Sequence, residues 1–203
     1  MKISSSLVEI FQTSINEYHI KDSVDQTFEN RFSKDQVFES MMCKKAWIDT
    51  VQWHLEDIIR KPDIESDKAL KIKRRIDSSN QERTDMVEMI DDYFFEEYSK
   101  SKASPNAILN TETPAWAIDR LSILALKIFH MSEEANRDSA SAEHRNKCSE
   151  KLNALIQQRE NLSKAIDQLL DNIKAGKVII STYKQMKMYN DESLNPELYS
   201  KDD

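Results

Sequence analysis

The stretch CSEKLNALIQQRENLSKAIDQLLDNI, residues 148–173, decides the fold class of this chain. Its apolar residues are spaced alternately by four and three positions, which is the spacing of helices that pack on one another. Arg159 interrupts this stripe, and Gly176 follows it in the position after a helix C-cap. The stretch therefore predicts a long helix over about 141–175 within an all-α bundle. The stripe consists of Cys148, Leu152, Leu155, Leu162, Ile166, Leu169 and Ile173.

Gly176 is the single glycine among 203 residues. Average usage of about 7% would give roughly fourteen. P-loops and dinucleotide fingerprints use glycines to bring backbone close to phosphate, and tight hairpins use them at positive φ. The sequence excludes such sites, so a phosphate site would have to use arginine or lysine side chains or a helix N-terminus.

Helix breakers divide the rest of the chain into four further predicted helices. Ser33-Lys34-Asp35-Gln36 fits a capping box and opens the second of them, which Pro62 stops. Thr113-Pro114 fits an N-cap with proline at the first helical position. We expect a single domain of about five helices, with a helix and loop over 1–32, a bundle core over 33–176 and a C-terminal strap over 177–203. The other predicted helices span about 5–17, 67–98 and 114–136.

Composition restricts the partners of the chain. A net charge of −7 argues against binding to nucleic acid or to an anionic membrane surface, because both require a basic face. Two cysteines are too few for a disulfide framework, which favours a reducing cytoplasm. We expect neither a signal peptide nor a membrane span, because no apolar run is long enough. A small molecule and a second copy of the chain remain as candidate partners, and the sequence indicates no particular cofactor.

Several polar residues fall on or near apolar helix stripes, where a charge needs a partner. They are Asn80, Arg83, Asp119 and Arg159. If the helices at 114–136 and 141–175 form an antiparallel hairpin, Asp119 lies level with Arg159. One interpretation is a buried ion pair. The other is a polar cavity in which these arginines grip an anion bidentately.

Acidic and imidazole groups provide two further hypotheses. Glu56-Asp57 and the pair Glu88 and Asp91 could hold magnesium, but in a tight hairpin about 27 Å of helix separates them. A surface on which Glu56 and Asp57 pair with basic residues at 70–74 is the alternative. His130 and Glu134 lie level with His144 and Cys148 and suggest a zinc ligand set. His130 lies off the main stripe, however, so no metal is expected. His54 beside Glu56 is a candidate general base.

These segments resemble the bacterial family named domain of unknown function 4254, over about residues 36–199. One departure is Ala115-Trp116, where a small residue such as glycine is expected. The resemblance implies a small cytosolic, all-helical bacterial protein with no established activity, loosely associated with cell-envelope sugar metabolism. The matching blocks are WHLEDIIR (53–60), KRRID (73–77), NQERTD (80–85), NTETP (110–114), DRLSILALKIFHM (119–131), YKQ (183–185), KMYND (187–191) and LNP (194–196).

Two functional hypotheses follow. In the first, the chain binds a polar or anionic small molecule of the nucleotide-sugar or phosphate type, either as a binding protein or as an enzyme, and its polar side chains converge on one pocket. The candidate acids and bases are His54, Glu56, Asp57, Asp77, Asp119 and His130. The candidate ligand-binding residues are Asn80, Arg83, Thr111, Thr113, Arg120, Lys127, Arg159, Lys187 and Asn190. In the second, the chain is a non-enzymatic scaffold that acts through oligomerisation, which predicts an exposed apolar patch.

Overall fold

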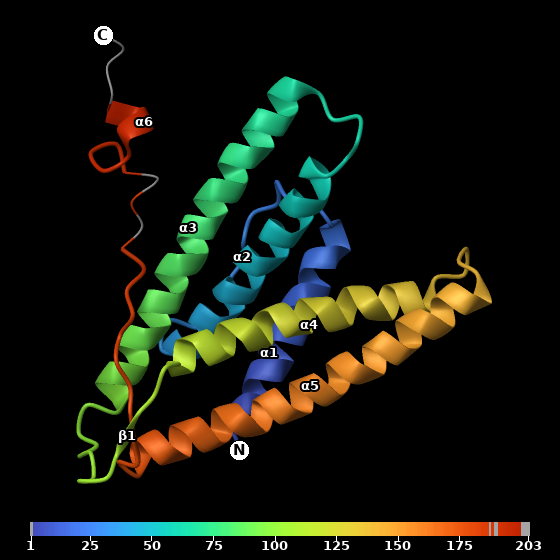
Figure 1. Cartoon of the computed structure of the whole chain (residues 1–203). Coiled ribbons are helices and arrows are strands. Elements are labelled where there is room, and N and C mark those ends of the chain that lie inside the picture. Colours follow the sequence, from blue (N-terminus) through green and yellow to red (C-terminus); the bar gives the residue numbers. More distant parts are fainter. Residues whose placement is uncertain (1, 187, 189–190, 200–203) are drawn as a thin grey trace.

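The computed structural model describes residues 2–186, 188 and 191–199, which form an all-α bundle with one very short parallel sheet (Figure 1). None of the described helices is long and apolar enough to cross a membrane. The elements in chain order are α1 (Ile3–Lys21), α2 (Val37–Ile59), α3 (Ser66–Glu97), β1 (Ile108–Leu109), α4 (Pro114–Asn136), α5 (Ala142–Lys174), β2 (Val178–Ile179) and α6 (Pro196–Tyr199).

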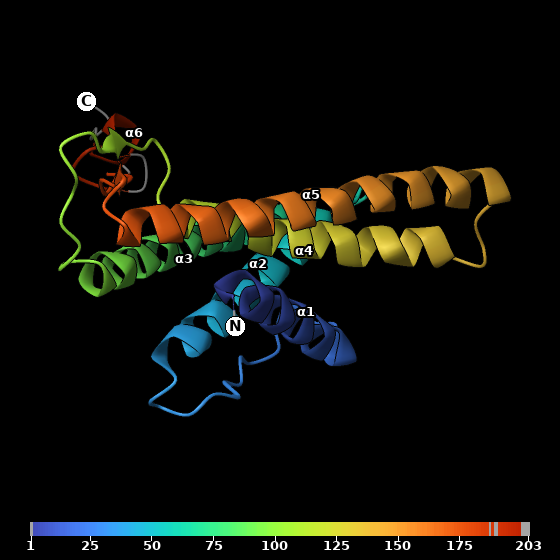
Figure 2. The same ribbon diagram turned by 90° about the horizontal axis from the view of Figure 1, so that it is seen from below.

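Helices α4 and α5 form the predicted antiparallel hairpin and lie side by side along their lengths (Figures 1 and 2). Helix α4 also contacts α1, α2 and α3, which agrees with the expectation of a central helix. Its N-terminus is the predicted one, since the Thr113 hydroxyl accepts a hydrogen bond from the Trp116 N–H and Pro114 occupies the first helical position. Figure 2 shows α1 and α2 on the same side of the α4–α5 hairpin.

The main core lies where the five long helices meet, and each contributes apolar side chains that are almost completely removed from water. Burying a large apolar side chain contributes about 1.5–3 kcal/mol, so this cluster is the main source of stability. A smaller cluster of Leu55, Ile72 and Ile76 holds the other end of α2 against α3. The main cluster includes Leu7 and Phe11 of α1, Met42 and Ala46 of α2, Ile90 and Phe94 of α3, Ile118 and Leu121 of α4, and Ile166 and Leu170 of α5.

Two of the predicted boundaries are wrong. Helix α1 continues four residues beyond its predicted end because Tyr18 is fully buried and packs edge-on against Trp47. Helix α2 begins at Val37 instead of Ser33. The Ser33 N–H does donate to the Gln36 side chain, as a capping box requires, but the residues between them form a turn.

Gly176 ends α5 with a φ of 67°, as its position in the sequence predicts. Its carbonyl accepts a hydrogen bond from the Ser104 N–H, which brings the 99–113 loop against the end of α5. β1 and β2 then pair in parallel, with Ile108 opposite Val178. Beyond β2 the chain runs along α3, where the Gln185 N–H donates to Glu88. The described residues of the tail therefore contain little regular structure beyond β2 apart from the short helix α6.

Candidate functional site

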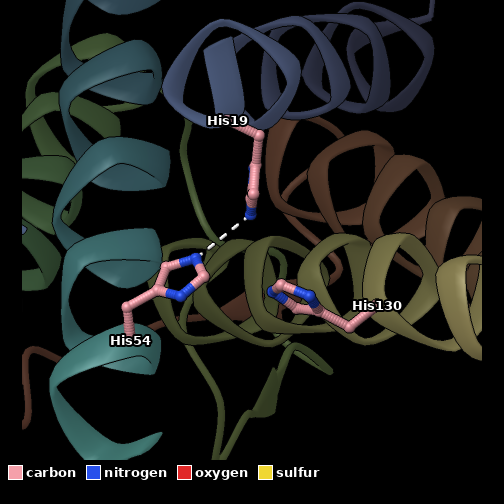
Figure 3. Close-up of side chains that lie close together, drawn as sticks. All are labelled: His19, His54 and His130. Atoms are coloured by element: carbon pink, nitrogen blue, oxygen red, sulfur yellow. Dashed lines mark hydrogen bonds between the residues drawn. The ribbon is translucent and has the colours of Figure 1, made fainter. Parts of the chain in front are cut away.

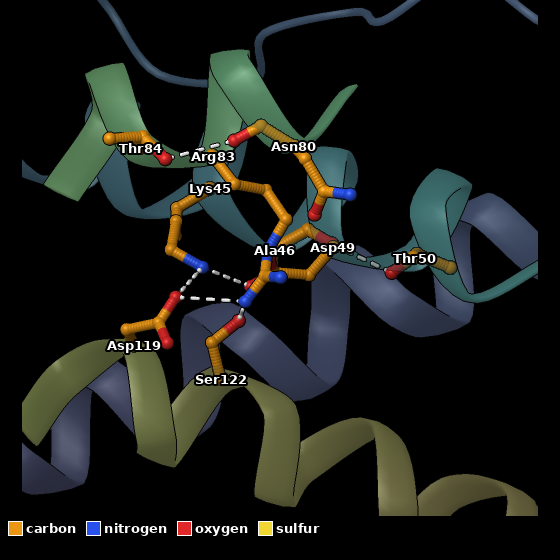
Figure 4. A network of polar contacts seen from close by, with 9 residues as sticks. All are labelled: Lys45, Ala46, Asp49, Thr50, Asn80, Arg83, Thr84, Asp119 and Ser122. Atoms are coloured by element: carbon orange, nitrogen blue, oxygen red, sulfur yellow. Dashed lines mark hydrogen bonds and ion pairs between the residues drawn. The ribbon is translucent and has the colours of Figure 1, made fainter. Parts of the chain in front are cut away.

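A buried network of charges joins α2, α3 and α4 (Figure 4). Lys45 and Asp49, one turn apart on α2, form an ion pair that is completely shielded from solvent. Lys45 Nζ also lies 2.7 Å from Asp119 Oδ1, and Arg83 Nε lies 2.7 Å from Asp49 Oδ1. Arg83 Nη2 lies 3.2 Å from Asp119 Oδ1, and the Ser122 hydroxyl donates to Asp49 Oδ2 at 2.6 Å.

This network is electrically balanced, with two cations and two carboxylates. Burial by itself lowers the pKa of Arg83, but the Asp49 and Asp119 carboxylates outweigh it and raise the pKa overall. Each cation is already paired, so the network has no unsatisfied positive charge to offer an anion. It links the three helices through paired charges and holds the Asp119 side chain in place.

The predicted ion pair between Asp119 and Arg159 is wrong. Asp119 turns toward Lys45 and Arg83, whereas Arg159 lines a separate pocket between α1, α4 and α5. The two residues line different pockets of the hairpin. Residue spacing predicts how far along a helix axis each residue lies. It does not predict how each helix is rotated about its axis, and this rotation decides which neighbour a side chain faces.

A groove of about 620 Å³ lies along α4 and α5 beside the network. Asp119, Arg120 and Lys127 line it from α4, and Gln158 and Asn161 line it from α5. The guanidinium of Arg120 is held by the Glu112 carboxylate through hydrogen bonds of 2.6 and 3.1 Å. The Lys127 ammonium has no ion-pair partner among the described residues. The apolar part of the wall comes from Trp116, Ile123, Leu124 and Leu162.

Three histidines from three helices form a second cluster (Figure 3). His19 of α1, His54 of α2 and His130 of α4 each place one ring nitrogen within 4.8 Å of the others. Burial is the main cause of the lowered pKa of His54, and the neighbouring histidines add to it, while Asp22 opposes it. Among the carboxylates near His54, Asp22 has the stronger effect, with its Oδ1 3.6 Å from His54 Nε2, and Asp57 adds a smaller one.

His19 is the member of this cluster that sequence reasoning missed. The predicted first helix ended at residue 17, so His19 was placed in a loop. A signal does exist, because His19 follows Ile15 by four positions and so continues the apolar stripe of α1.

The remaining sequence-predicted residues lie at separate places on the molecule. Glu56 pairs with Arg60 and Asp77 with Lys73, each within its own helix, so the expected pairing between α2 and α3 is not present at these residues. The candidate zinc set also divides, since Glu134 and Cys148 contact His144 while His130 contacts Glu133.

Other candidates are explained by local structure. Thr113 is buried as the N-cap of α4, whereas Thr111 and Asp57 are exposed on other surfaces. The carbonyl of Asn80 accepts a hydrogen bond from the Thr84 hydroxyl, and Asn80 faces the buried network. Lys187 and Asn190 lie outside the described residues. The candidates are therefore divided among the network, the groove, the histidine cluster and the surface, and they do not converge on one pocket.

Comparison with known families identifies the chain at the family level. A family model described as "Protein of unknown function (DUF4254)" matches residues 39–182. The chain belongs to this family. The matched DUF4254 segment begins in α2 and ends just after β2, so it contains the network, the groove and two of the three clustered histidines. His19 precedes it. No curated protein and no solved structure matches the chain.

Proposed function

We propose that the protein binds a polar, phosphate-bearing small molecule, such as a sugar phosphate or nucleotide-sugar, in the α4–α5 groove. The observation that carries this proposal is the Lys127 ammonium, an exposed cation that lines a groove whose other charges are neutralised and that has no ion-pair partner among the described residues. Arg120 is matched by Glu112, and Asp119 is held from behind by Lys45 and Arg83. The groove therefore presents one uncompensated positive charge, which suits a phosphate group.

The other lining groups suit the non-phosphate part of such a ligand. The indole of Trp116 offers an aromatic face for a sugar or base ring, and the amides of Gln158 and Asn161 can donate and accept hydrogen bonds from hydroxyls. Apolar walls with a few convergent polar groups are the usual make-up of small-molecule sites. This proposal uses fewer residues than sequence reasoning selected, because the others lie away from the groove, are held in structural contacts or fall outside the described residues.

A thermal-shift panel with inorganic phosphate, glucose, glucose 1-phosphate and uridine diphosphate glucose tests the proposal. A probe at 100 times its dissociation constant stabilises the fold by about 2.7 kcal/mol. We expect the phosphate-bearing sugars to stabilise the protein and glucose alone to have little effect. Calorimetric titration should show that Lys127→Met weakens binding about tenfold, which corresponds to about 1.4 kcal/mol.

Lys68→Met is the matched control, because Lys68 is an exposed lysine near the start of α3 and does not line the groove. It removes the same charge from the molecule and should leave the affinity unchanged. Flat responses to every probe would contradict the proposal. Equal losses of affinity in the two lysine variants would also contradict it, because they would show a general charge effect.

A scaffold function is the second candidate, and one surface favours it. Ile108 and Leu109 of β1 are 71% and 60% exposed, and Ile179 of β2 lies beside them with 40% exposure. Self-association through this sheet would bury these side chains. Light scattering distinguishes the two candidate functions. The scaffold function requires a wild-type dimer that Ile108→Lys converts to a monomer. A monomeric wild-type protein would contradict the scaffold function.

A further inference from the structure

The histidine cluster is built from parts of the chain that are distant in sequence. His19 Nε2 and His54 Nε2 lie 3.1 Å apart, and the His130 ring lies beside both (Figure 3). Two imidazole nitrogens at this distance need either one shared proton or one shared cation, because two bare lone pairs or two N–H groups would repel each other.

The outer contacts of His19 and His130 fix where their protons lie. His19 Nδ1 is 2.7 Å from the Ile15 carbonyl oxygen, which can only accept a hydrogen bond. His130 Nδ1 is 2.9 Å from a Glu133 carboxylate oxygen, which also accepts. Both Nδ1 atoms therefore carry the proton, and in each neutral ring Nε2 keeps its lone pair. This is the tautomer in which histidine binds a metal through Nε2.

The Nε2 atom of His130 supplies an independent observation. It is buried and has no hydrogen-bond partner among the described residues. A buried acceptor left unsatisfied loses its hydrogen bonds to water without replacement, so such atoms are uncommon in folded proteins. A cation between the three rings would satisfy this nitrogen together with the lone pair of His19.

The distances suit a transition metal ion. Zn–N bonds of about 2.0–2.1 Å in a tetrahedral site place two ligand nitrogens about 3.3 Å apart. The 3.1 Å between His19 and His54 is close to this value, and a rotation of the His130 ring brings separations of up to 4.8 Å into the same range. Asp22 lies near a fourth position, at the left-handed residue that ends α1.

Aromatic side chains hold each ring in place. Phe129 stacks on His19 with centroids 4.2 Å apart, Tyr18 stacks on His54 at 5.2 Å, and Trp53 stacks on His130 at 4.9 Å. These stacks keep the three rings close to one another. The carbonyl of Ile15 and the carboxylate of Glu133 provide the outer hydrogen bonds that orient metal-binding histidines in proteins.

We propose that His19, His54 and His130 form a binding site for one divalent transition metal ion, with Zn²⁺ the preferred ion and Asp22 or water as its fourth ligand. The site joins α1 to α2 and α4, so the bound ion stabilises the docking of the N-terminal helix. The proposal is independent of the groove, because none of its ligands lines that surface.

Equilibrium dialysis of the chelator-treated full chain against ZnCl₂ tests the site, with no small-molecule ligand present. We expect one Zn²⁺ per chain and a raised melting temperature. His19→Ala, His54→Ala and His130→Ala should each lower the affinity by at least about 100-fold, beyond the 10–100-fold typical of losing an outer-sphere partner. Glu133→Gln removes only an outer-sphere partner of His130, so it should lower Zn²⁺ affinity by about 10–100-fold.

His144→Ala is the matched control, because His144 is the fourth and last histidine of the sequence and contacts Glu134 and Cys148 instead. It should leave Zn²⁺ affinity unchanged. If an alanine variant fails to fold, the absorption spectrum of the wild-type Co²⁺ complex distinguishes the proposed site from one that contains a cysteine. Nitrogen and oxygen ligands give no thiolate charge-transfer band in the near ultraviolet. Absence of stoichiometric binding, a thiolate band, or loss of binding in His144→Ala alone would overturn the proposal.

Discussion

At the scale of single residues, the solvent exposure of an ion pair determines how much stability the protein loses when one partner is substituted. Lys45 and Asp49 show no solvent exposure, whereas the Lys147–Glu143 pair, with the same spacing on α5, is largely exposed. The two pairs have similar geometry but differ in solvation. Removing one member of a buried pair leaves the other charge uncompensated, whereas water replaces the lost partner of an exposed pair.

We therefore expect Asp49→Ala to lower the free energy of unfolding by about 3–5 kcal/mol, because Lys45 and Arg83 lose their carboxylate. Lys147→Ala should change it by less than about 1 kcal/mol. Urea unfolding followed by circular dichroism measures both. Similar small losses for the two variants would show that the network does not stabilise the helix junction.

Asp91 of α3 predicts a pH dependence. Burial raises its pKa, although the Thr113 hydroxyl and the Ala115 N–H oppose this shift. The folded state therefore binds the proton more tightly than the unfolded state does. The resulting stability is present at low pH and is lost as the pH rises through the folded-state pKa.

Asp91→Asn removes this titration at nearly constant shape. Unfolding free energies measured from about pH 4 to about pH 7 should show the wild type losing stability relative to the variant as the pH rises. A constant difference would mean that Asp91 titrates normally, and a difference of opposite slope would mean that its pKa is lowered.

At the scale of elements, the sequence predicts the positions of helices along the chain better than it predicts which elements pack against each helix. The stripe of α5 and the Thr113-Pro114 start of α4 come from local spacing and capping, and both agree with the structure. The spacing of Ile15 and His19 is a weak local signal for the extension of α1, but the burial of Tyr18 against Trp47 is a tertiary contact that local spacing does not contain.

The candidate site shows the same limit. Residue spacing identified Asp119 as a polar residue in an apolar helix, but its partners come from α2 and α3, and Lys45 was not recognised. His54 and His130 were selected separately for other roles. Their convergence with His19 depends on the crossing of α1, α2 and α4, and one sequence does not determine a crossing angle.

Gly176 carries a prediction about the end of α5. A β-carbon at this residue would overlap the carbonyl oxygen of Lys102, and the φ of 67° disfavours other residues. We expect Gly176→Val to destabilise the docking of the 99–113 loop and the tail by about 1–3 kcal/mol. Hydrogen exchange at the amides of Ser104, Ile108 and Asn110, which bond to this segment, should become faster.

Ala175→Val is the control for this prediction. Ala175 precedes the glycine, is exposed and has an ordinary φ of −79°, so a valine there meets no strain. Its exchange pattern should match the wild type. Equal effects of the two substitutions would indicate that side-chain size, and not the backbone of Gly176, controls the docking of the loop.

At the scale of the whole molecule, the chain should unfold as one unit. The main core takes side chains from all five long helices, so no helix pair keeps an intact core after the others separate. Calorimetry should show one transition whose van't Hoff and calorimetric enthalpies agree. Two separate transitions would contradict the expectation of a single domain.

A crystal structure of the protein grown with uridine diphosphate glucose, at a concentration that saturates the thermal shift, tests whether the α4–α5 groove binds a phosphate-bearing sugar compound. We expect ligand density in the groove, with a phosphate oxygen within hydrogen-bond distance of Lys127 Nζ and a ring against Trp116. Density at another surface, or an empty groove under these conditions, would contradict it.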